Sequence, residues 1–213
     1  MRTDDLIDML GTNVETVNGA KRRVALLGAI GIGAAAAFCL VAVIFGMPGQ
    51  ALGARFLGLT ALTLAFTLSL TIAGARFLSI AARPGKVGRG ALTAIAVLFS
   101  GLVLAAGVAL SRENPAEWRA MIFGPQWAAC LMCIPVAAVA PFVALVWYLR
   151  DEAPTRLRLT GGVAGLVAGA IGTTAFALHH PGGSLAFVAI WFGVPLLLCA
   201  LIGALLGPRL LRW

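Results

Sequence analysis

The stretch VALLGAIGIGAAAAFCLVAVIFG, Val24 to Gly46, contains no charged side chain. An α-helix needs about 20 apolar residues to cross the hydrocarbon core of a bilayer, which is about 30 Å thick, and this stretch exceeds that length. A helix is the expected form because backbone amides that face lipid must be hydrogen-bonded within their own segment. The stretch therefore predicts a membrane-spanning helix.

Five further uncharged, apolar stretches of similar length follow it: 56–75, 90–110, 126–149, 159–178 and 184–207. Of the 213 residues, 61% are hydrophobic and only 11% are charged, which lies outside the range of water-soluble domains. We therefore predict an all-α, polytopic membrane protein. Its membrane domain, residues 24–213, is a bundle of six transmembrane helices.

A cleavable signal peptide is the alternative interpretation of the first stretch, because basic residues 21–23 precede it. A signal core runs to about 15 residues and ends at a site flanked by small residues, whereas this stretch continues to Gly46. A lipid-modified cysteine at position 39 is also disfavoured, because bulky Phe38 precedes it. We expect a retained first helix in which Cys39 is buried.

The basic residues predict the orientation, because lysine and arginine are enriched in cytoplasmic loops. Only Arg55, Arg112 and Arg119 fall in the segments on one side of the six stretches, and the other 13 of the 16 basic residues fall on the opposite side. Both termini are therefore expected in the cytoplasm. The net charge of +8 is then a sign of topology, and direct nucleic-acid binding is not expected.

None of the six stretches contains Asp, Glu, Lys or Arg. Ion-coupled carriers usually place such groups within the membrane, and hydrolases need a nucleophile with its base. We therefore expect no enzyme. The competing interpretations are a membrane scaffold subunit and a small-molecule or ion transporter whose pathway would be lined by threonines such as Thr60, Thr63, Thr67 and Thr71. Threonines at this spacing more often bond to their own helix.

Two local patterns have structural interpretations. Asn114-Pro115-Ala116 is a tripeptide found in water channels, but it occurs once here, between Glu113 and Glu117. We interpret it as the start of a short interfacial turn that runs through Trp118. Glycines spaced four residues apart in the last two stretches predict close packing of these helices: Gly161, Gly165, Gly169, Gly203 and Gly207.

Cysteine and histidine side chains gather at the predicted outer ends of the helices. Cys130 lies about one helical turn below Trp127, and Cys133 follows it on the same face. His179 and His180 occupy the outer turn before the last stretch. Because thiolate and imidazole bind zinc, copper and similar metals, Cys130 and His180 are the main candidates for a sensing site, and Cys133 and His179 are secondary candidates. Cys199 lies deeper in its helix and is expected to be structural.

The segment before the first stretch has a different character. In residues 1–10, which we call the head, Leu6, Ile7 and Leu10 share one face of a helix while the acidic residues share the other. Thr3 is a candidate N-cap, and Asp4 and Asp5 fall in the first turn, where the helix dipole favours them. Anionic lipid should repel this acidic segment. The alternatives that remain are a helix that docks into a protein groove and a mere leader before the first span.

Several of these features together carry a family resemblance. They are the opening Arg2-Thr3-Asp4-Asp5-Leu6-Ile7, the six spans, Cys130, Leu149-Arg150 with Ala153-Pro154, Phe187 to Trp191, and the closing Leu211-Arg212-Trp213. With them the chain resembles the NrsF-type membrane anti-sigma factors over nearly its full length. The resemblance implies that the N-terminal segment, residues 1–23, holds an extracytoplasmic-function (ECF) sigma factor at the bacterial inner membrane. The docking residues expected from the helical pattern of the head are Thr3, Asp4, Asp5, Leu6, Ile7 and Leu10.

The resemblance also implies release of the sigma factor under heavy-metal or oxidative stress, through two cysteines on the periplasmic side. Cys130 matches the first of them, whereas the second falls at His180. A cysteine and a histidine can bind a metal but cannot close a disulfide. The sequence requires no cofactor, and a heavy-metal ion bound transiently at the periplasmic face would be the signal. Membrane lipid is the other expected partner, and the oligomeric state is left open.

Overall fold

The computed structural model describes residues 19–46, 54–81, 88–124, 127–152, 154–179 and 184–212, and no strand occurs within these ranges. The elements are α2 (Gly19–Phe45), α3 (Ala54–Ala81), α4 (Arg89–Ser111), α5 (Trp118–Ile122), α6 (Trp127–Arg150), α7 (Leu157–His179), α8 (Leu185–Phe187), the π-helix η1 (Val188–Phe192) and α9 (Gly193–Leu210). The predicted all-α class is confirmed.

Six helical segments are long and apolar enough to cross a membrane, as the six stretches predicted. The sixth is continuous through α8, η1 and α9. The largest differences in bounds are at Gly19, where α2 begins before Val24, and at Ala81, where α3 continues beyond Ala75. Basic residues at these ends continue the helix, because charge limits the apolar stretch without ending the backbone hydrogen bonds.

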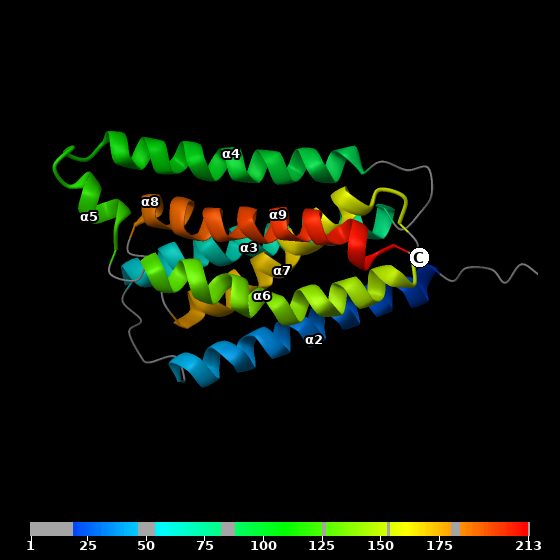
Figure 1. Cartoon of the computed structure of the whole chain (residues 1–213). Coiled ribbons are helices and arrows are strands. Elements are labelled where there is room, and N and C mark those ends of the chain that lie inside the picture. Colours follow the sequence, from blue (N-terminus) through cyan, green and yellow to red (C-terminus); the bar gives the residue numbers. More distant parts are fainter. Residues whose placement is uncertain are drawn as a thin grey trace, which may run out of the picture.

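Helix α7 forms the centre of the bundle (Figure 1). It packs against α9, α6, α3 and α2, and most of its side chains between Thr160 and Ala177 are buried. Helix α4 lies at the edge, where it contacts mainly α3 and α8. The side chains of Val97, Val103 and Leu104 on α4 are exposed, so this helix presents a broad apolar face to the surroundings.

Glycines bring α7 and α9 together, as their spacing predicted. A Cβ atom added at Gly161 would overlap the carbonyl oxygen of Gly203, and one added at Gly165 would overlap that of Cys199. These two helices therefore approach each other backbone to backbone, which small residues permit in an apolar surrounding.

Three of the four threonines of α3 donate hydrogen bonds within the bundle, whereas the buried hydroxyl of Thr60 has no hydrogen-bond partner among the described residues. The hydroxyl of Thr63 donates to the carbonyl oxygen of Leu59 at 2.9 Å, that of Thr67 to Thr63 at 3.1 Å, and that of Thr71 to Thr67 at 2.9 Å. Thr174 of α7 also donates to the hydroxyl of Thr67 at 2.9 Å. These bonds hold the hydroxyls on their own helix or against α7, and they give no support to a polar transport pathway.

The start of α2, the end of α9 and the segment between α6 and α7 lie at one end of the bundle, which we call the terminal end (Figure 1). Helix α5 and the start of α8 lie at the opposite end, which we call the loop end. The two ends of the described chain therefore share one side of the bundle, as an even number of spans requires.

Candidate functional site

The head residues Thr3, Asp4, Asp5, Leu6, Ile7 and Leu10 lie outside the described residues, and so does His180. The structure describes the helix into which the head leads, the secondary sensing candidates and Cys130. The site is therefore built from two described regions, the start of α2 at the terminal end and the cysteine and histidine region towards the loop end.

An ion pair connects the start of α2 to the segment after α6. The Nε atom of Arg22 lies 3.0 Å from Oε2 of Glu152, whose side chain is 7% exposed. Burial raises the pKa of the Glu152 carboxyl; Arg22 opposes this shift, and the neighbouring Asp151 adds to it. The sequence interpretation did not single out this pair, because the two residues are far apart along the chain.

The middle of α2 packs closely on α6. A Cβ atom added at Gly33 would lie 2.6 Å from the Cα atom of Pro141, so α2 crosses α6 with almost no space between the backbones. Pro135 and Pro141 both lie inside α6, where each leaves a carbonyl of the preceding turn without its helical hydrogen bond. A proline is a common cause of a helix kink, so α2 rests on the part of α6 that bends most easily.

Cys130 lies in the first turn of α6, below Trp127, as the sequence predicted. Its side chain is only 1% exposed, within an apolar cluster that includes Phe66 of α3, Phe176 of α7 and Phe187 of α8. A metal ion or oxidant can reach this thiol only if side chains at the loop end move apart. Cys133 is partly buried one turn further along α6.

The other two cysteines differ from each other. Cys199 is buried against Gly169 of α7, which fits the structural role expected of it. Cys39 is in the helix but exposed, so the expectation that it is buried was wrong. Hydropathy does not distinguish a side chain that faces lipid from one that faces another helix, because lipid tails are as apolar as leucine.

His179 is the last residue of α7, and its ring packs 6.4 Å from that of Phe38 of α2. Its Nδ1 atom lies 3.0 Å from the carbonyl oxygen of Ala175, which can only accept, so Nδ1 carries the proton. The Nε2 atom is buried, with no hydrogen-bond partner among the described residues. In the tautomer with the proton on Nδ1, Nε2 carries the lone pair through which a histidine binds a metal.

The described residues do not by themselves form a metal site. No group of three or more His, Cys, Asp or Glu side chains comes together in the described part of the chain. Cys130 packs in the cluster around Phe176, whereas His179 contacts Phe38. His180, the other main candidate ligand, lies beyond the described ranges.

Hydrogen bonds close the loop end beside this region. The indole N–H of Trp191 donates to the carbonyl oxygen of Ile122 at 2.8 Å, and the hydroxyl of Ser184 donates to that of Met121 at 2.7 Å. We call these two bonds the α5 clamp. Trp191 lies in η1, and its ring centroid is 5.1 Å from that of Trp127. π-helical turns occur frequently at functional sites. In the sequence, the position of Trp191 near an outer helix end was the only indication of the α5 clamp.

The chain is similar to known proteins over its whole length. Residues 10–213 match the family model NrsF, described as a negative regulator of sigma F. The chain is similar to the probable anti-sigma-F factor NrsF of Azospira oryzae, with 33% identity over 216 aligned positions, and to the anti-sigma-F factor NrsF of Caulobacter vibrioides, with 34% identity over 220. Both alignments cover 100% of this chain and of the relative. No solved structure matches.

Proposed function

The chain belongs to the NrsF family of negative regulators of sigma F, and on this premise we propose that it is a membrane-bound anti-sigma factor that sequesters an ECF sigma factor through its head. The observation that carries the proposal is the full-length similarity to two anti-sigma-F factors. The NrsF family is regulatory, and the proposed role involves binding and release without chemistry on a substrate.

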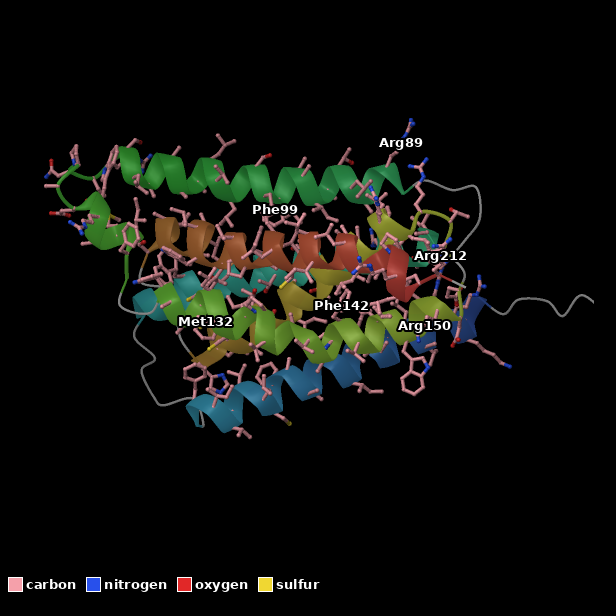
Figure 2. The ribbon with its side chains drawn as sticks, in the orientation of Figure 1. Arg89, Phe99, Met132, Phe142, Arg150 and Arg212 are labelled. Carbon is pink, nitrogen blue, oxygen red and sulfur yellow. The ribbon has the colours of Figure 1, made fainter. Side chains whose placement is uncertain are left out.

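Membrane insertion is the first part of the proposal. The six helices expose many large apolar side chains on the outside of the bundle, including Val43, Met132 and Trp147. A water-soluble protein rarely has so large an apolar surface, because its exposure to water is unfavourable. Arginines gather at the terminal end, where Arg89, Arg150 and Arg212 lie (Figure 2). By the positive-inside rule this end faces the cytoplasm of a bacterial inner membrane, which places the head where a sigma factor can reach it.

The head is the proposed docking element. Leu6, Ile7 and Leu10 would enter an apolar groove on the sigma factor, while the carboxylates of Asp4 and Asp5 face the basic rim expected of a protein that binds nucleic acid. The family match begins at Leu10, whereas the two relatives align over the whole chain. The alignments with these relatives thus extend across residues 1–10, which supports a head that they have in common.

Release is proposed to begin at the loop end, which would face the periplasm when the terminal end faces the cytoplasm. A heavy-metal ion bound by the Cys130 thiolate and the His180 imidazole, or oxidation of the single Cys130 thiol, would disturb the packing of the first turn of α6. Metal binding releases the thiol proton to water, so it becomes stronger as pH rises. Because Cys130 is 1% exposed, the proposed signal acts by holding open an arrangement in which this thiol is accessible.

The route from the sensing region to the head is proposed to run along α6 into α2. Helix α6 carries Cys130 near one end, contacts Gly33 of α2 at Pro141, and is followed by Glu152, which pairs with Arg22. Coupling needs two arrangements of the bundle that differ in affinity of the head for its partner. A change in the bend of α6 would alter both contacts with the helix that bears the head.

The docking role can be tested with an immobilised peptide of residues 1–23 and a matched peptide that carries Leu6→Asp and Ile7→Asp. We expect the first peptide to retain an ECF sigma factor from cells of the source organism and the second to retain none. Equal retention by both peptides, or retention by neither, would contradict the assignment of the head.

The sensing role is tested separately with a Cys130→Ala and His180→Ala double variant in cells exposed to heavy metal. We expect this variant to hold its sigma factor under stress, whereas Cys199→Ala, which removes another buried thiol, should respond normally. A normal response of the double variant would contradict the sensing proposal without affecting the docking proposal.

A further inference from the structure

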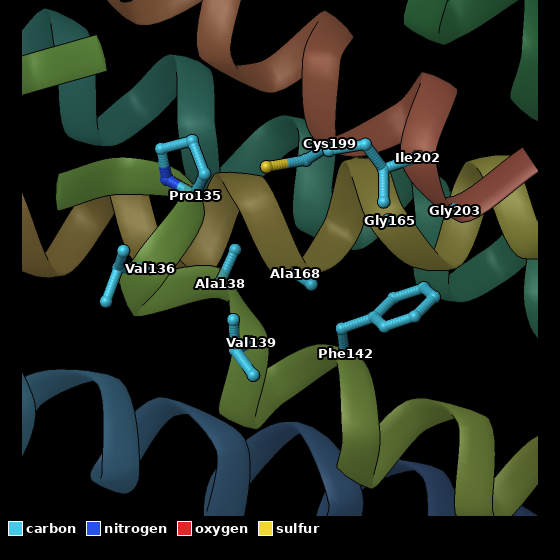
Figure 3. A pocket seen from close by; sticks show the side chains of 10 residues that line it. All are labelled: Pro135, Val136, Ala138, Val139, Phe142, Gly165, Ala168, Cys199, Ile202 and Gly203. Atoms are coloured by element: carbon cyan, nitrogen blue, oxygen red, sulfur yellow. The ribbon is translucent and has the colours of Figure 1, made fainter. Parts of the chain in front are cut away.

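An apolar groove runs between α6 and α9 (Figure 3). Val139 and Phe142 of α6 and Ile202 of α9 line it, and Gly165 and Ala168 of α7 lie along its floor. The groove has a volume of about 260 Å³. Val139 and Ile202 are 59% and 48% exposed, so the groove opens onto the outer surface of the bundle.

The groove continues towards the terminal end. Phe142 also lines a second hollow of about 360 Å³, together with Val146, Trp147, Arg150 and Leu210. Trp147 is 74% exposed, as is usual for a tryptophan near the boundary between lipid and headgroups. The two hollows share Phe142, so they adjoin each other along α6; we call the pair the channel, and Arg150 lines its end.

Arg150 is held at the mouth of this channel. Its Nε atom donates a hydrogen bond to the carbonyl oxygen of Leu210 at 2.8 Å, which ties the end of α6 to the end of α9. The residue is exposed, and Arg209 and Arg212 are exposed at the same end of α9. A fixed guanidinium among further arginines favours an anionic group at this position, because guanidinium groups bind phosphate through paired hydrogen bonds.

We propose that this channel binds an anionic phospholipid of the cytoplasmic leaflet, with the phosphate at Arg150 and one acyl chain along α6. The distance fits: Val139 lies eleven positions before Arg150, which corresponds to about 16 Å of helix, and one leaflet contributes about 15 Å of hydrocarbon. The proposal rests on the membrane insertion proposed above and is independent of sigma-factor binding.

A second groove in the same bundle provides a comparison. It lies between α3 and α4 and is lined by Leu62, Phe66, Val97 and Leu102, with Ser69 as its polar residue. No basic residue lines it. This groove offers contact to any acyl chain but nothing to a headgroup, so it serves as the internal control for lipid selectivity.

The test uses the full chain purified in detergent and titrated with phosphatidylglycerol or phosphatidylcholine of identical acyl chains, with bound lipids counted by native mass spectrometry. We expect one phosphatidylglycerol to bind selectively. Arg150→Gln should weaken its binding about fivefold, the change expected for one basic residue near an anionic headgroup. Arg89→Gln, an exposed arginine at the same end on α4, is the matched control and should leave binding unchanged.

The apolar part of the site is tested by filling it. Val139→Phe with Ile202→Phe should reduce phosphatidylglycerol binding, whereas Val97→Phe in the α3–α4 groove should not. Glycerol phosphate, which carries the anionic group without acyl chains, should not compete at equal concentration. Equal binding of the two lipids, equal loss in Arg150→Gln and Arg89→Gln, or full competition by glycerol phosphate would overturn the proposal.

Discussion

The Nε atom of Arg22, in the first turn of α2, lies 3.0 Å from the Oε2 atom of Glu152, in the segment that follows α6. This contact joins the helix that follows the head to the segment directly after α6, the helix that carries Cys130. The Glu152 side chain is 7% exposed and that of Arg22 is 36% exposed. The charge of Arg22 is therefore partly solvated by water, whereas the charge of Glu152 is compensated mainly by Arg22.

Removal of the arginine should therefore destabilise the bundle. Arg22→Met leaves the Glu152 carboxylate buried without its counter-charge and should cost about 1–2 kcal/mol, less than a fully buried pair because Arg22 is partly solvated. For a chain of this size each kcal/mol lowers the thermal midpoint by about 2–4 °C. Arg23→Met in the same turn is the control, and an equal loss in both variants would contradict a specific role of the pair.

The buried carboxyl of Glu152 also predicts that the stability of the bundle depends on pH. The pKa of Glu152 is raised from its ordinary value of 4.5, so the folded protein holds this proton more tightly than the unfolded chain. Protonation of the buried Glu152 carboxyl therefore stabilises the folded state; this contribution is complete below pH 4.5 and is lost as pH rises through the raised pKa, even though Arg22 offsets part of the cost of the charged form. Thermal midpoints in detergent should fall across this range in the wild type, and Glu152→Gln should remove that part of the fall. An unchanged pH profile in Glu152→Gln would contradict the assignment.

Two glycines of α2 test the route to the head. Gly33 faces Pro141 of α6, whereas a Cβ atom at Gly31 would meet nothing within 4 Å. Gly33→Ala should push α2 away from α6 and change the amount of sigma factor retained in unstressed cells. Gly31→Ala should behave as the wild type. If both variants respond to metal and hold the partner normally, α2 does not transmit the signal through this crossing.

The contact between α7 and α9 predicts a large difference between two similar substitutions. Gly165→Ala would make a methyl group overlap the carbonyl oxygen of Cys199. It should destabilise the bundle by about 1–3 kcal/mol, the usual cost of overpacking. Gly101→Ala in α4 meets open space and should have almost no effect. Thermal midpoints of the two variants in one detergent measure the difference, and equal midpoints would argue against the close approach.

The α5 clamp should make the loop end harder to open. Trp191→Phe retains an aromatic ring but loses the N–H that donates to Ile122. Hydrogen exchange of the amides of residues 119–123 should become faster, and labelling of Cys130 by a thiol reagent should increase, because the first turn of α6 lies beside this clamp. Trp118→Phe, which removes the donation from the first residue of α5 to Leu110 of α4, is the control. Unchanged labelling of Cys130 in Trp191→Phe would show that the α5 clamp does not control access to this thiol.

The fold was largely predictable because apolar stretches of about 20 residues admit few structures in lipid. The spacing of Gly161, Gly165 and Gly203 also predicted where two helices meet. The exposed Cys39 was not predictable, since lipid and protein surroundings favour the same residue types. Contacts between distant segments, such as Arg22 with Glu152 and Gly33 with Pro141, carry no signal in a single sequence.

The candidate site was also predictable only in part. The sequence placed Cys130 one turn from the end of its helix, but its burial among Phe66, Phe176 and Phe187 depends on how three other elements pack. That burial changes the sensing hypothesis, because the thiol must first become accessible. The roles of the head residues and of His180 remain predictions from the sequence and the family.

The most direct test of the central claim measures sigma factor in the membrane fraction of unstressed cells that carry the full chain or a chain lacking residues 2–10. We predict that the full chain retains the sigma factor on membranes, whereas the truncated chain, inserted in equal amount, releases it to the soluble fraction and raises transcription of its target genes. Retention of the sigma factor on membranes by the truncated chain would contradict the account.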